Sequence, residues 1–152
     1  MTTTCTTPEE ITAAFEHARR YSRHIIVEQY LKGRDYRVLV AGGVIAAASC
    51  RRPPYVIGNG KSNITQLVDA ENQNPARGAG HTNILTKIPL DDLALAMVRK
   101  QGYEFDSVPA AGACVELRGN ANLSTGGTAE DVTDLLPEET AQICIRAAKT
   151  IG

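Results

Sequence analysis

The residues best suited to chemistry in this sequence lie in one polar stretch, residues 117–134, which reads LRGNANLSTGGTAEDVTD. Its candidate binding residues are Arg118, Asn120, Ser124, Gly126 and Gly127. Adjacent glycines permit positive φ, so successive N–H groups can turn toward one point, and a guanidinium offers a bidentate fork for phosphate or carboxylate. The stretch therefore predicts an anion-binding site. A polar surface turn after a strand is the alternative that the same composition allows.

The overall charge balance excludes several classes of partner. Sixteen Lys and Arg residues face 17 Asp and Glu residues, which leaves a formal net charge of -1. No field of the whole protein therefore attracts nucleic acid or an anionic membrane, and any basic site must be local. With 152 residues and 43% hydrophobic content, the chain is long enough to bury a core of its own.

Cysteine spacing and hydropathy indicate a soluble cytoplasmic protein. The four cysteines form no C-x-x-C pair, which argues against zinc and against a dense disulfide framework, so we expect reduced thiols. The longest apolar run, residues 38–49, is interrupted by two glycines and is too short to span a bilayer. No secretory signal pattern is present at the N-terminus.

The first third of the chain predicts one helix and three strands. Thr7-Pro8-Glu9-Glu10 forms a capping box, and the helix that follows has an apolar face of Ile11, Ala14, Phe15 and Ala18. Residues 25–30 form an apolar, β-branched run that predicts a strand. Residues 36–40 and 44–48 predict a hairpin that turns at Gly42-Gly43. Glu28 ends the first of these strands, where a carboxylate is either a terminus that reaches water or a functional group.

Residues 54–112 change character and predict a small inserted α/β subdomain. A short helix begins after Ser62 or Asn63, and a second helix covers residues 90–100, with Gly102 as its stop signal. The predicted apolar face of the second helix consists of Leu90, Leu93, Ala94 and Met97. The insert also carries Arg77, His81 and Lys87, which fit solvated surface positions or contacts to an acidic ligand.

The last part of the chain predicts a strand at residues 114–117 and a helix after Leu136-Pro137. The face of that helix is Cys144, Ala147, Ala148 and Ile151. The elements together predict an α+β fold in which an antiparallel sheet is flanked by helices.

Five motifs in order give the sequence a resemblance to a known family. VEQYLKGRDYRVLVAGG, RPPYVIGNG, GHTNILTKIPLD, QGYEFDSVPAAG and LRGNANLSTGGTAEDVTD resemble the ATP-grasp region of cyanophycin synthetase, over residues 7–152. The ATP-grasp half of bifunctional glutathione synthetases shares the V-E-x-[YF]-[IL]-x-G-x-[DE]-[YF]-R start and the L-R-x-N-x-N-[LI]-S-T-G-G loop. Two of the motifs are closer to the cyanophycin type, GHTNILTKIPLD and NANLSTGGTAEDVTD.

The resemblance implies a partial ATP-grasp fold and an ATP-dependent carboxylate-amine ligase. In such enzymes ATP lies between two antiparallel sheets, the γ-phosphate passes to a substrate carboxylate, and an amine then displaces phosphate from the acyl phosphate. The cyanophycin type adds aspartate to a poly-aspartate backbone, and magnesium neutralises the transferring phosphate. The resemblance further implies a homo-oligomeric parent protein whose remaining chain would be a partner of this segment.

The motifs also assign roles by position. Glu28, Gln29 and Leu31 would belong to the adenine hinge, and Asp35 would hold the ribose hydroxyls. Asn120, Ser124, Gly126 and Gly127 would border the phosphates and the substrate carboxylate. Arg118 would be catalytic, as a fixed cation beside developing negative charge.

The sequence departs from the family pattern at both ends and at one turn. The lysine-bearing strand with its glycine-rich flap and the magnesium-binding Asp/Glu and Asn motif are not found in residues 1–152. We therefore expect a fragment of an ATP-grasp domain that is inactive alone, with its metal ligands outside the fragment. Asn59 stands where the family usually has Asp in a G-D-G turn, a change that such a turn tolerates.

Two alternatives to the cyanophycin-type ligase stay open. One is the ATP-grasp segment of a glutathione synthetase, which differs in donor and acceptor rather than in chemistry. The other is a non-catalytic module whose insert binds an acidic polymer.

Overall fold

The computed structural model describes residues 5–29, 31, 33–80 and 82–151. The chain divides into two units, of which the first ends at Gly33 and the second begins at Arg34. Each unit is described by itself below.

The first unit contains one helix, α1 (Pro8–Arg19), and its start confirms the predicted capping box. The Thr7 hydroxyl accepts a hydrogen bond from the Glu10 N–H at 3.2 Å, and the Glu10 carboxylate accepts from the Thr7 N–H at 3.3 Å. These bonds satisfy N–H groups that have no partner inside the helix. No residue of α1 is buried, so the predicted apolar face forms without being covered within this unit.

The strand predicted at residues 25–30 is wrong for the residues that the structure describes. Residues 25–29 have no regular structure, and Ile26 and Val27 are 82% and 79% exposed. A β-branched run becomes a strand only when a neighbour takes its backbone hydrogen bonds and one of its faces is covered. No described residue pairs with this run, and Tyr30 lies outside the described residues.

The second unit is built on an antiparallel sheet of β1 (Asp35–Ala41), β2 (Val44–Arg52) and β7 (Thr128–Asp131), in the order β1-β2-β7. The hairpin prediction is confirmed: Gly42 and Gly43 form its turn with φ of 59° and 80°, which glycine adopts without steric cost. Ala48 and Cys50 are buried on one face of the sheet, whereas Leu39, on the other face, is 58% exposed.

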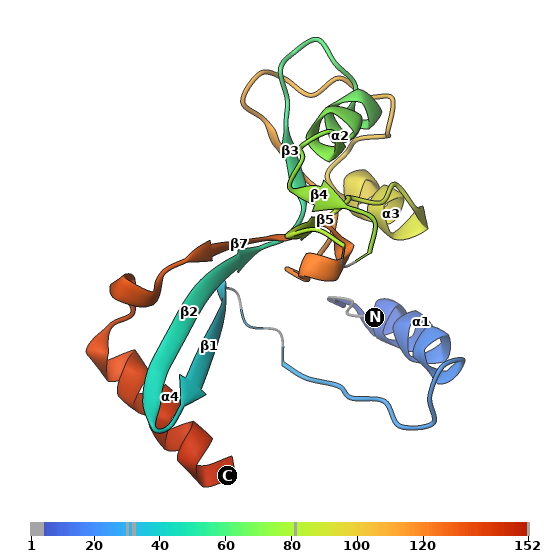
Figure 1. The fold of residues 1–152 in the computed structure, drawn as a ribbon. Coiled ribbons are helices and arrows are strands. Elements are labelled where there is room, and N and C mark those ends of the chain that lie inside the picture. Colours follow the sequence, from blue (N-terminus) through green and yellow to red (C-terminus); the bar gives the residue numbers. More distant parts are fainter. Residues whose placement is uncertain (1–4, 30, 32, 81, 152) are drawn as a thin grey trace. The chain divides into compact units, whose positions relative to one another are not determined.

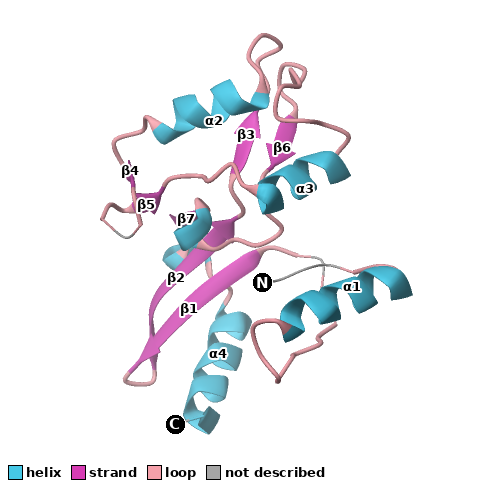
Figure 2. Cartoon of the chain, turned by 90° about the vertical axis from the view of Figure 1, so that its right-hand side faces the viewer, coloured by secondary structure: helices cyan, strands magenta, loops and turns pink. Residues whose placement is uncertain are grey.

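Helix α4 (Glu138–Ile151) lies along β1 and β2 (Figures 1 and 2). Its predicted position is confirmed, but its predicted face is partly wrong. Ala141 is the buried residue of the helix, and Ile151 is 87% exposed. A short 3-10 helix, η2 (Thr133–Leu135), leads from β7 into α4, and the Thr133 hydroxyl accepts a hydrogen bond from the Ala48 N–H at 2.9 Å.

The remaining elements of the second unit surround an apolar core. Strands β3 (Tyr55–Ile57) and β6 (Cys114–Glu116) pair antiparallel, and helices α2 (Ile64–Asn72) and α3 (Asp92–Lys100) pack beside them. The core consists of Val56, Ile64, Val68, Ile88, Val98, Val115 and Leu117. Two-residue strands β4 (Arg77–Gly78) and β5 (Leu85–Thr86) pair parallel, and the 3-10 helix η1 (Leu123–Thr125) follows β6.

Local signals placed both helices of this region. Asn63 caps α2 by accepting from the Gln66 N–H at 2.8 Å, and Gly102, with a φ of 82°, follows α3 as predicted. The predicted face of α3 is partly wrong, because Ala94 and Val98 are buried and Leu93 is 50% exposed. The limits predicted for an inserted subdomain, residues 54–112, stay a prediction.

The α+β fold class is confirmed, and the expectation of reduced thiols stays a prediction. Within the described residues, none of the helices combines the length and apolarity that a bilayer crossing requires.

Candidate functional site

The polar stretch leaves β6 as a loop, residues 118–127, and Arg118 at its start is buried, with 6% of its surface exposed. Its guanidinium donates two parallel hydrogen bonds to the carboxylate of Asp91, at 2.7 Å from Nη1 and 2.6 Å from Nη2. Such a pair neutralises the cation and fixes its orientation. An incoming anion would have to compete with this carboxylate for Arg118.

Asp91 is held by three groups at once. Besides accepting from Arg118, it is the N-cap of α3 and accepts from the N–H groups of Leu93 and Ala94, both at 3.0 Å. The hydrogen bond from Arg118 is the main cause that holds the pKa of Asp91 below its ordinary value, and the cap bonds add to it. The start of the polar loop is thereby tied to the first turn of α3.

The end of the loop is a tight turn closed by its own hydrogen bonds. The N–H groups of Thr125 and Gly127 donate to the Asn122 carbonyl at 3.2 and 3.1 Å, and the Gly126 N–H donates to the Leu123 carbonyl at 3.1 Å. The expectation that N–H groups around the two glycines converge on an external anion is therefore wrong for Gly126 and Gly127.

Close packing explains why the turn requires both glycines. Gly126 has a φ of 93°, and a Cβ atom on it would lie 2.8 Å from the Cα of Ile88. A Cβ atom on Gly127 would lie 2.8 Å from the Asn122 carbonyl oxygen and 2.9 Å from that of Arg52. Both distances are too short for real atoms, so the two positions exclude any side chain.

The loop also presents polar side chains to solvent. Ser124 and Asn122 are exposed, and nothing in the described part of the chain hydrogen-bonds to the Ser124 hydroxyl or the Asn122 side-chain amide. The Asn120 side chain is half-buried, and its carbonyl oxygen accepts from the Thr125 hydroxyl at 3.5 Å. A hydroxyl and an amide are suitable donors for a phosphate or carboxylate oxygen.

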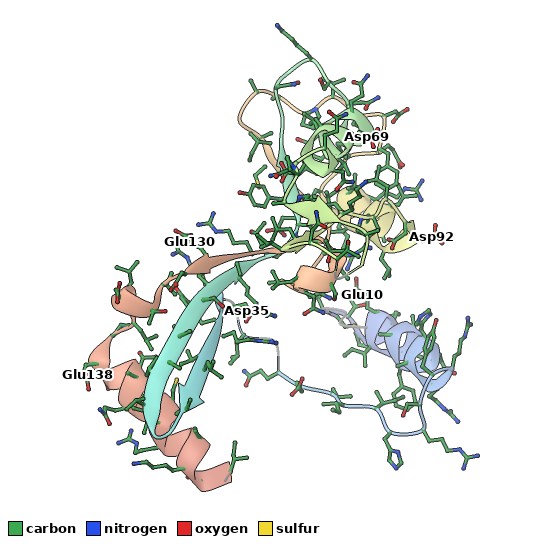
Figure 3. The ribbon with its side chains drawn as sticks, viewed as in Figure 1. Glu10, Asp35, Asp69, Asp92, Glu130 and Glu138 are labelled. Carbon is green, nitrogen blue, oxygen red and sulfur yellow. The ribbon has the colours of Figure 1, made fainter. Side chains whose placement is uncertain are left out.

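The sheet brings Asp35 to the same end as this loop. Asp35 begins β1 and lies opposite Arg51 of β2, which in turn lies opposite Ala129 of β7, two residues after Gly127. Figure 3 shows Asp35 at the start of β1. Two strand spacings, about 10 Å, separate Asp35 from this part of β7. Asp35 is exposed, so its carboxylate is accessible to a ligand at this end of the sheet.

The three residues expected at the adenine hinge belong to the other unit. Glu28, Gln29 and Leu31 are exposed and precede Arg34, where the second unit begins. Their assignment to an adenine hinge stays a prediction.

The described residues do not fit a metal site of their own. They contain no group of three or more His, Cys, Asp and Glu side chains that could hold an ion. Magnesium at this site would therefore need ligands from elsewhere.

Two residues of this site were not identified from the sequence. Asp91 carries a cap signal, since an aspartate precedes a helical pattern, but its pairing with Arg118 joins residues 27 positions apart. Of the two positions open for Arg77 in the sequence, the solvated surface position is wrong: the residue is 5% exposed and contacts the loop at Gly126. No local pattern signals such a long-range contact. His81 lies outside the described residues.

Comparison with known proteins confirms the resemblance that the motifs indicated. No family model matches the chain. It is 49% identical over 144 residues to cyanophycin synthetases of Trichormus variabilis and Nostoc sp., which covers 95% of this chain and 16% of each relative. It is 36% identical over 143 residues to the glutathione biosynthesis bifunctional protein GshAB of Clostridium perfringens, which covers 94% of this chain and 18% of that relative.

A solved structure gives the same result for the fold. The bifunctional glutathione synthetase from Pasteurella multocida superposes with a TM-score of 0.67 and 36% identity, over 90% of this chain and 18% of that one. The chain thus has part of the ATP-grasp fold, and it spans about a sixth of the length of the curated relatives that it matches.

Proposed function

We propose that this chain is a segment of an ATP-dependent carboxylate-amine ligase of the cyanophycin synthetase type, which adds aspartate to a poly-aspartate backbone. The observation that carries the proposal is the difference in identity: 49% to the cyanophycin synthetases against 36% to the glutathione-type relative, over almost the same residues. The glutathione-type ligase is the second candidate, supported by the match to the Pasteurella structure.

The proposed chemistry has two steps. A carboxylate oxygen attacks the γ-phosphorus of ATP, the bond from that phosphorus to the β-bridging oxygen breaks, and ADP leaves. The amine nitrogen of the incoming amino acid then attacks the acyl carbon, phosphate departs with the former carboxylate oxygen, and the nitrogen loses a proton. Phosphoryl transfer of this kind depends mostly on positioning and electrostatic stabilisation.

In this proposal the polar loop supplies contacts to the anionic groups through side chains. The Ser124 hydroxyl and the Asn122 amide would donate to phosphate or carboxylate oxygens, and Asn120, Gly126 and Gly127 would set the shape of the turn. Asp35 would accept hydrogen bonds from the ribose hydroxyls at the same end of the sheet. We keep Glu28, Gln29 and Leu31 as the proposed adenine hinge.

Arg118 receives a different role from the one expected of it. Because its guanidinium is buried and already bonded to Asp91, we assign it to holding the loop rather than to the transition state. A positioning role predicts that the conservative variant Arg118→Lys loses part of the activity and that Asp91→Asn loses a similar part, since both variants break the same bidentate pair.

The proposal is tested in a Nostoc cyanophycin synthetase whose matching segment is replaced by the 144 aligned residues of this chain. We expect release of ADP that requires both aspartate and a poly-aspartate primer. Ser124→Ala should lower kcat/KM by about tenfold or more, as for the loss of a donor to a charged oxygen. Ser62→Ala, in the loop between β3 and α2, is the matched control.

Three outcomes separate the candidates. ADP release with γ-glutamylcysteine and glycine, but not with aspartate and primer, would favour the glutathione-type ligase. Binding of poly-aspartate to the 152-residue chain, without any nucleotide-dependent activity in the chimera, would favour the non-catalytic module. Primer-dependent activity with the expected loss on Ser124→Ala supports the proposal.

A further inference from the structure

Arg77 is the second buried arginine of the described residues, and it contacts the opposite end of the loop from Arg118. Its Nη1 donates to two carbonyl oxygens, those of Thr86 at 2.8 Å and Gly126 at 3.0 Å. Its Nε and Nη2 both bond to one carboxylate oxygen of Glu71, at 3.1 and 3.0 Å. One guanidinium thus joins the end of α2, strand β5 and the Gly-Gly turn.

A second chain of contacts reaches the same turn through Asn72, the last residue of α2. Its side-chain amide donates to the Ile88 carbonyl at 2.9 Å and its carbonyl oxygen accepts from the Ile88 N–H at 2.7 Å. Ile88 is buried, and it lies so close to Gly126 that a Cβ atom there would be 2.8 Å from the Ile88 Cα. The backbone at Ile88 is therefore fixed where it limits the position of the turn.

A buried arginine contributes little net free energy to the stability of a fold. Desolvation of the guanidinium opposes the attraction to its partner, and apolar residues of similar volume often stabilise as well or better. Among the described residues the two buried charged side chains both fix this ten-residue loop: Arg118, its first residue, binds Asp91 at the start of α3, and Arg77 binds the Gly126 carbonyl near its end. Their shared target indicates that the geometry of the loop, rather than the stability of the core, is what these ion pairs specify.

We propose that the end of α2 together with β4 and β5 is a rigid support for loop 118–127, and that Arg77 is its positioning residue. The support would hold the Gly126 carbonyl so that the Ser124 hydroxyl and the Asn122 amide face the anionic groups without further ordering. This inference rests on the proposed function for the identity of the ligand. The contacts of Arg77 and Asn72 that hold the turn, called the clamp below, are a property of the free chain and are testable without any ligand.

Amide hydrogen exchange of the 152-residue chain, followed residue by residue by NMR, tests the clamp. Arg77→Met keeps the length and volume of the stem but removes every donor, so the amides of Gly126 and Gly127 should exchange about tenfold faster or more. Arg77→Lys, with one ammonium in place of the fork, should give a smaller increase. Arg99→Met, at an exposed arginine paired with Glu104, is the matched control and should leave these amides unchanged.

The Leu117 amide reports in the same spectra whether the fold is intact, because it donates to the Pro54 carbonyl at 2.8 Å between β6 and β3. Faster exchange at Gly126 and Gly127 with an unchanged Leu117 supports the inference. Unchanged exchange at all three amides overturns it.

If Arg77→Met also speeds amide exchange at Leu117, the fold itself is disturbed, and the variant Asn72→Asp becomes the test. This variant keeps an acceptor for the Ile88 N–H, and it replaces the donor to the Ile88 carbonyl by a negatively charged oxygen that repels it. Faster exchange at Gly126 and Gly127 with unchanged exchange at Leu117 then supports the inference that α2, β4 and β5 hold the turn. Unchanged exchange at Gly126 and Gly127 overturns it.

The functional part is tested in the chimeric synthetase. Arg77→Lys should lower kcat by about tenfold while the KM for ATP changes less than about twofold, since a misplaced loop affects reacting groups more than nucleotide binding. Arg99→Met should leave both constants unchanged. A chimera without activity would refute the proposed function and leave the exchange result standing, whereas normal kcat for Arg77→Lys in an active chimera would refute positioning.

Discussion

Removing the charge of Asp91 is the most informative single perturbation of the loop. Asp91→Asn keeps an oxygen that can cap α3, because asparagine is as good an N-cap as aspartate, but it takes the anion from Arg118. Asp91→Ala removes both functions. Comparison of the two variants therefore separates the ion pair from the helix cap.

The expected losses follow from the geometry. Removing one partner of a fully buried ion pair costs about 3–5 kcal/mol. The Arg118 side chain is 7% exposed and the Asp91 side chain 49% exposed, so solvent around the carboxylate reduces the loss, and we expect about 2 kcal/mol for Asp91→Asn. Loss of the cap adds about 1 kcal/mol, which gives about 3 kcal/mol for Asp91→Ala.

The assay is urea unfolding followed by circular dichroism at neutral pH and low salt, for each variant and for the wild type. Glu104→Gln is the matched control, because it breaks an ion pair of similar length, 2.7 Å, between side chains that are 59% and 51% exposed. A double-mutant cycle with Arg118→Met should show coupling between Asp91 and Arg118. Our reasoning is refuted if Asp91→Asn destabilises the chain no more than Glu104→Gln does.

Four further outcomes are expected. The folded-state pKa of Asp91 is lowered, so its stabilising effect should be complete above its unfolded pKa of about 3.9 and disappear as pH falls through the folded value. The difference in free energy of unfolding between wild type and Asp91→Asn, measured in urea, should therefore narrow below about pH 4. Thr7→Ala removes the cap of α1 and should speed amide exchange in its first turn, with a local cost of about 1 kcal/mol. Burial, assisted by the charge of Glu116, raises the pKa of the Cys114 thiol, so Glu116→Gln should speed alkylation of Cys114 at pH 8, as mass spectrometry would detect. Gly126→Ala should destabilise the chain by at least about 1–3 kcal/mol in urea unfolding, from backbone strain at positive φ and from the clash of the new Cβ with Ile88.

These outcomes have their own controls and contradictions. A constant gap between wild type and Asp91→Asn down to pH 2 would contradict the lowered pKa. Exchange in the first turn of α1 that is as slow in Thr7→Ala as in wild type would contradict the capping box. Cys5 serves as the internal reference for alkylation, and Gly33→Ala, where a Cβ would meet nothing within 4 Å, is the reference for Gly126→Ala.

Local chemistry was sufficient to predict how elements begin, turn and end. Thr7 and Asn63 cap their helices, Gly42-Gly43 turns the hairpin, and Gly102 follows α3. Each of these signals is an interaction between residues within four positions, which a sequence displays directly.

Interactions between distant residues explain what the sequence did not predict. The run at residues 25–29 has strand propensity, but propensity is realised only when a neighbouring strand is present. The N–H groups of the Gly-Gly turn donate to the Asn122 and Leu123 carbonyls, which lie within the same loop. The partners of Arg77 and Arg118 depend on packing between α2, α3 and the loop, which no local pattern encodes.

The central claim is that loop 118–127 is a preorganised binding element of a ligase active site. Its most direct test is ADP release by the Nostoc chimera with aspartate and a poly-aspartate primer, for the wild-type segment, Ser124→Ala and Arg77→Lys. The account predicts primer-dependent release that falls about tenfold in both variants while KM for ATP stays within about twofold in Arg77→Lys. Release that is equally fast in all three proteins would contradict it.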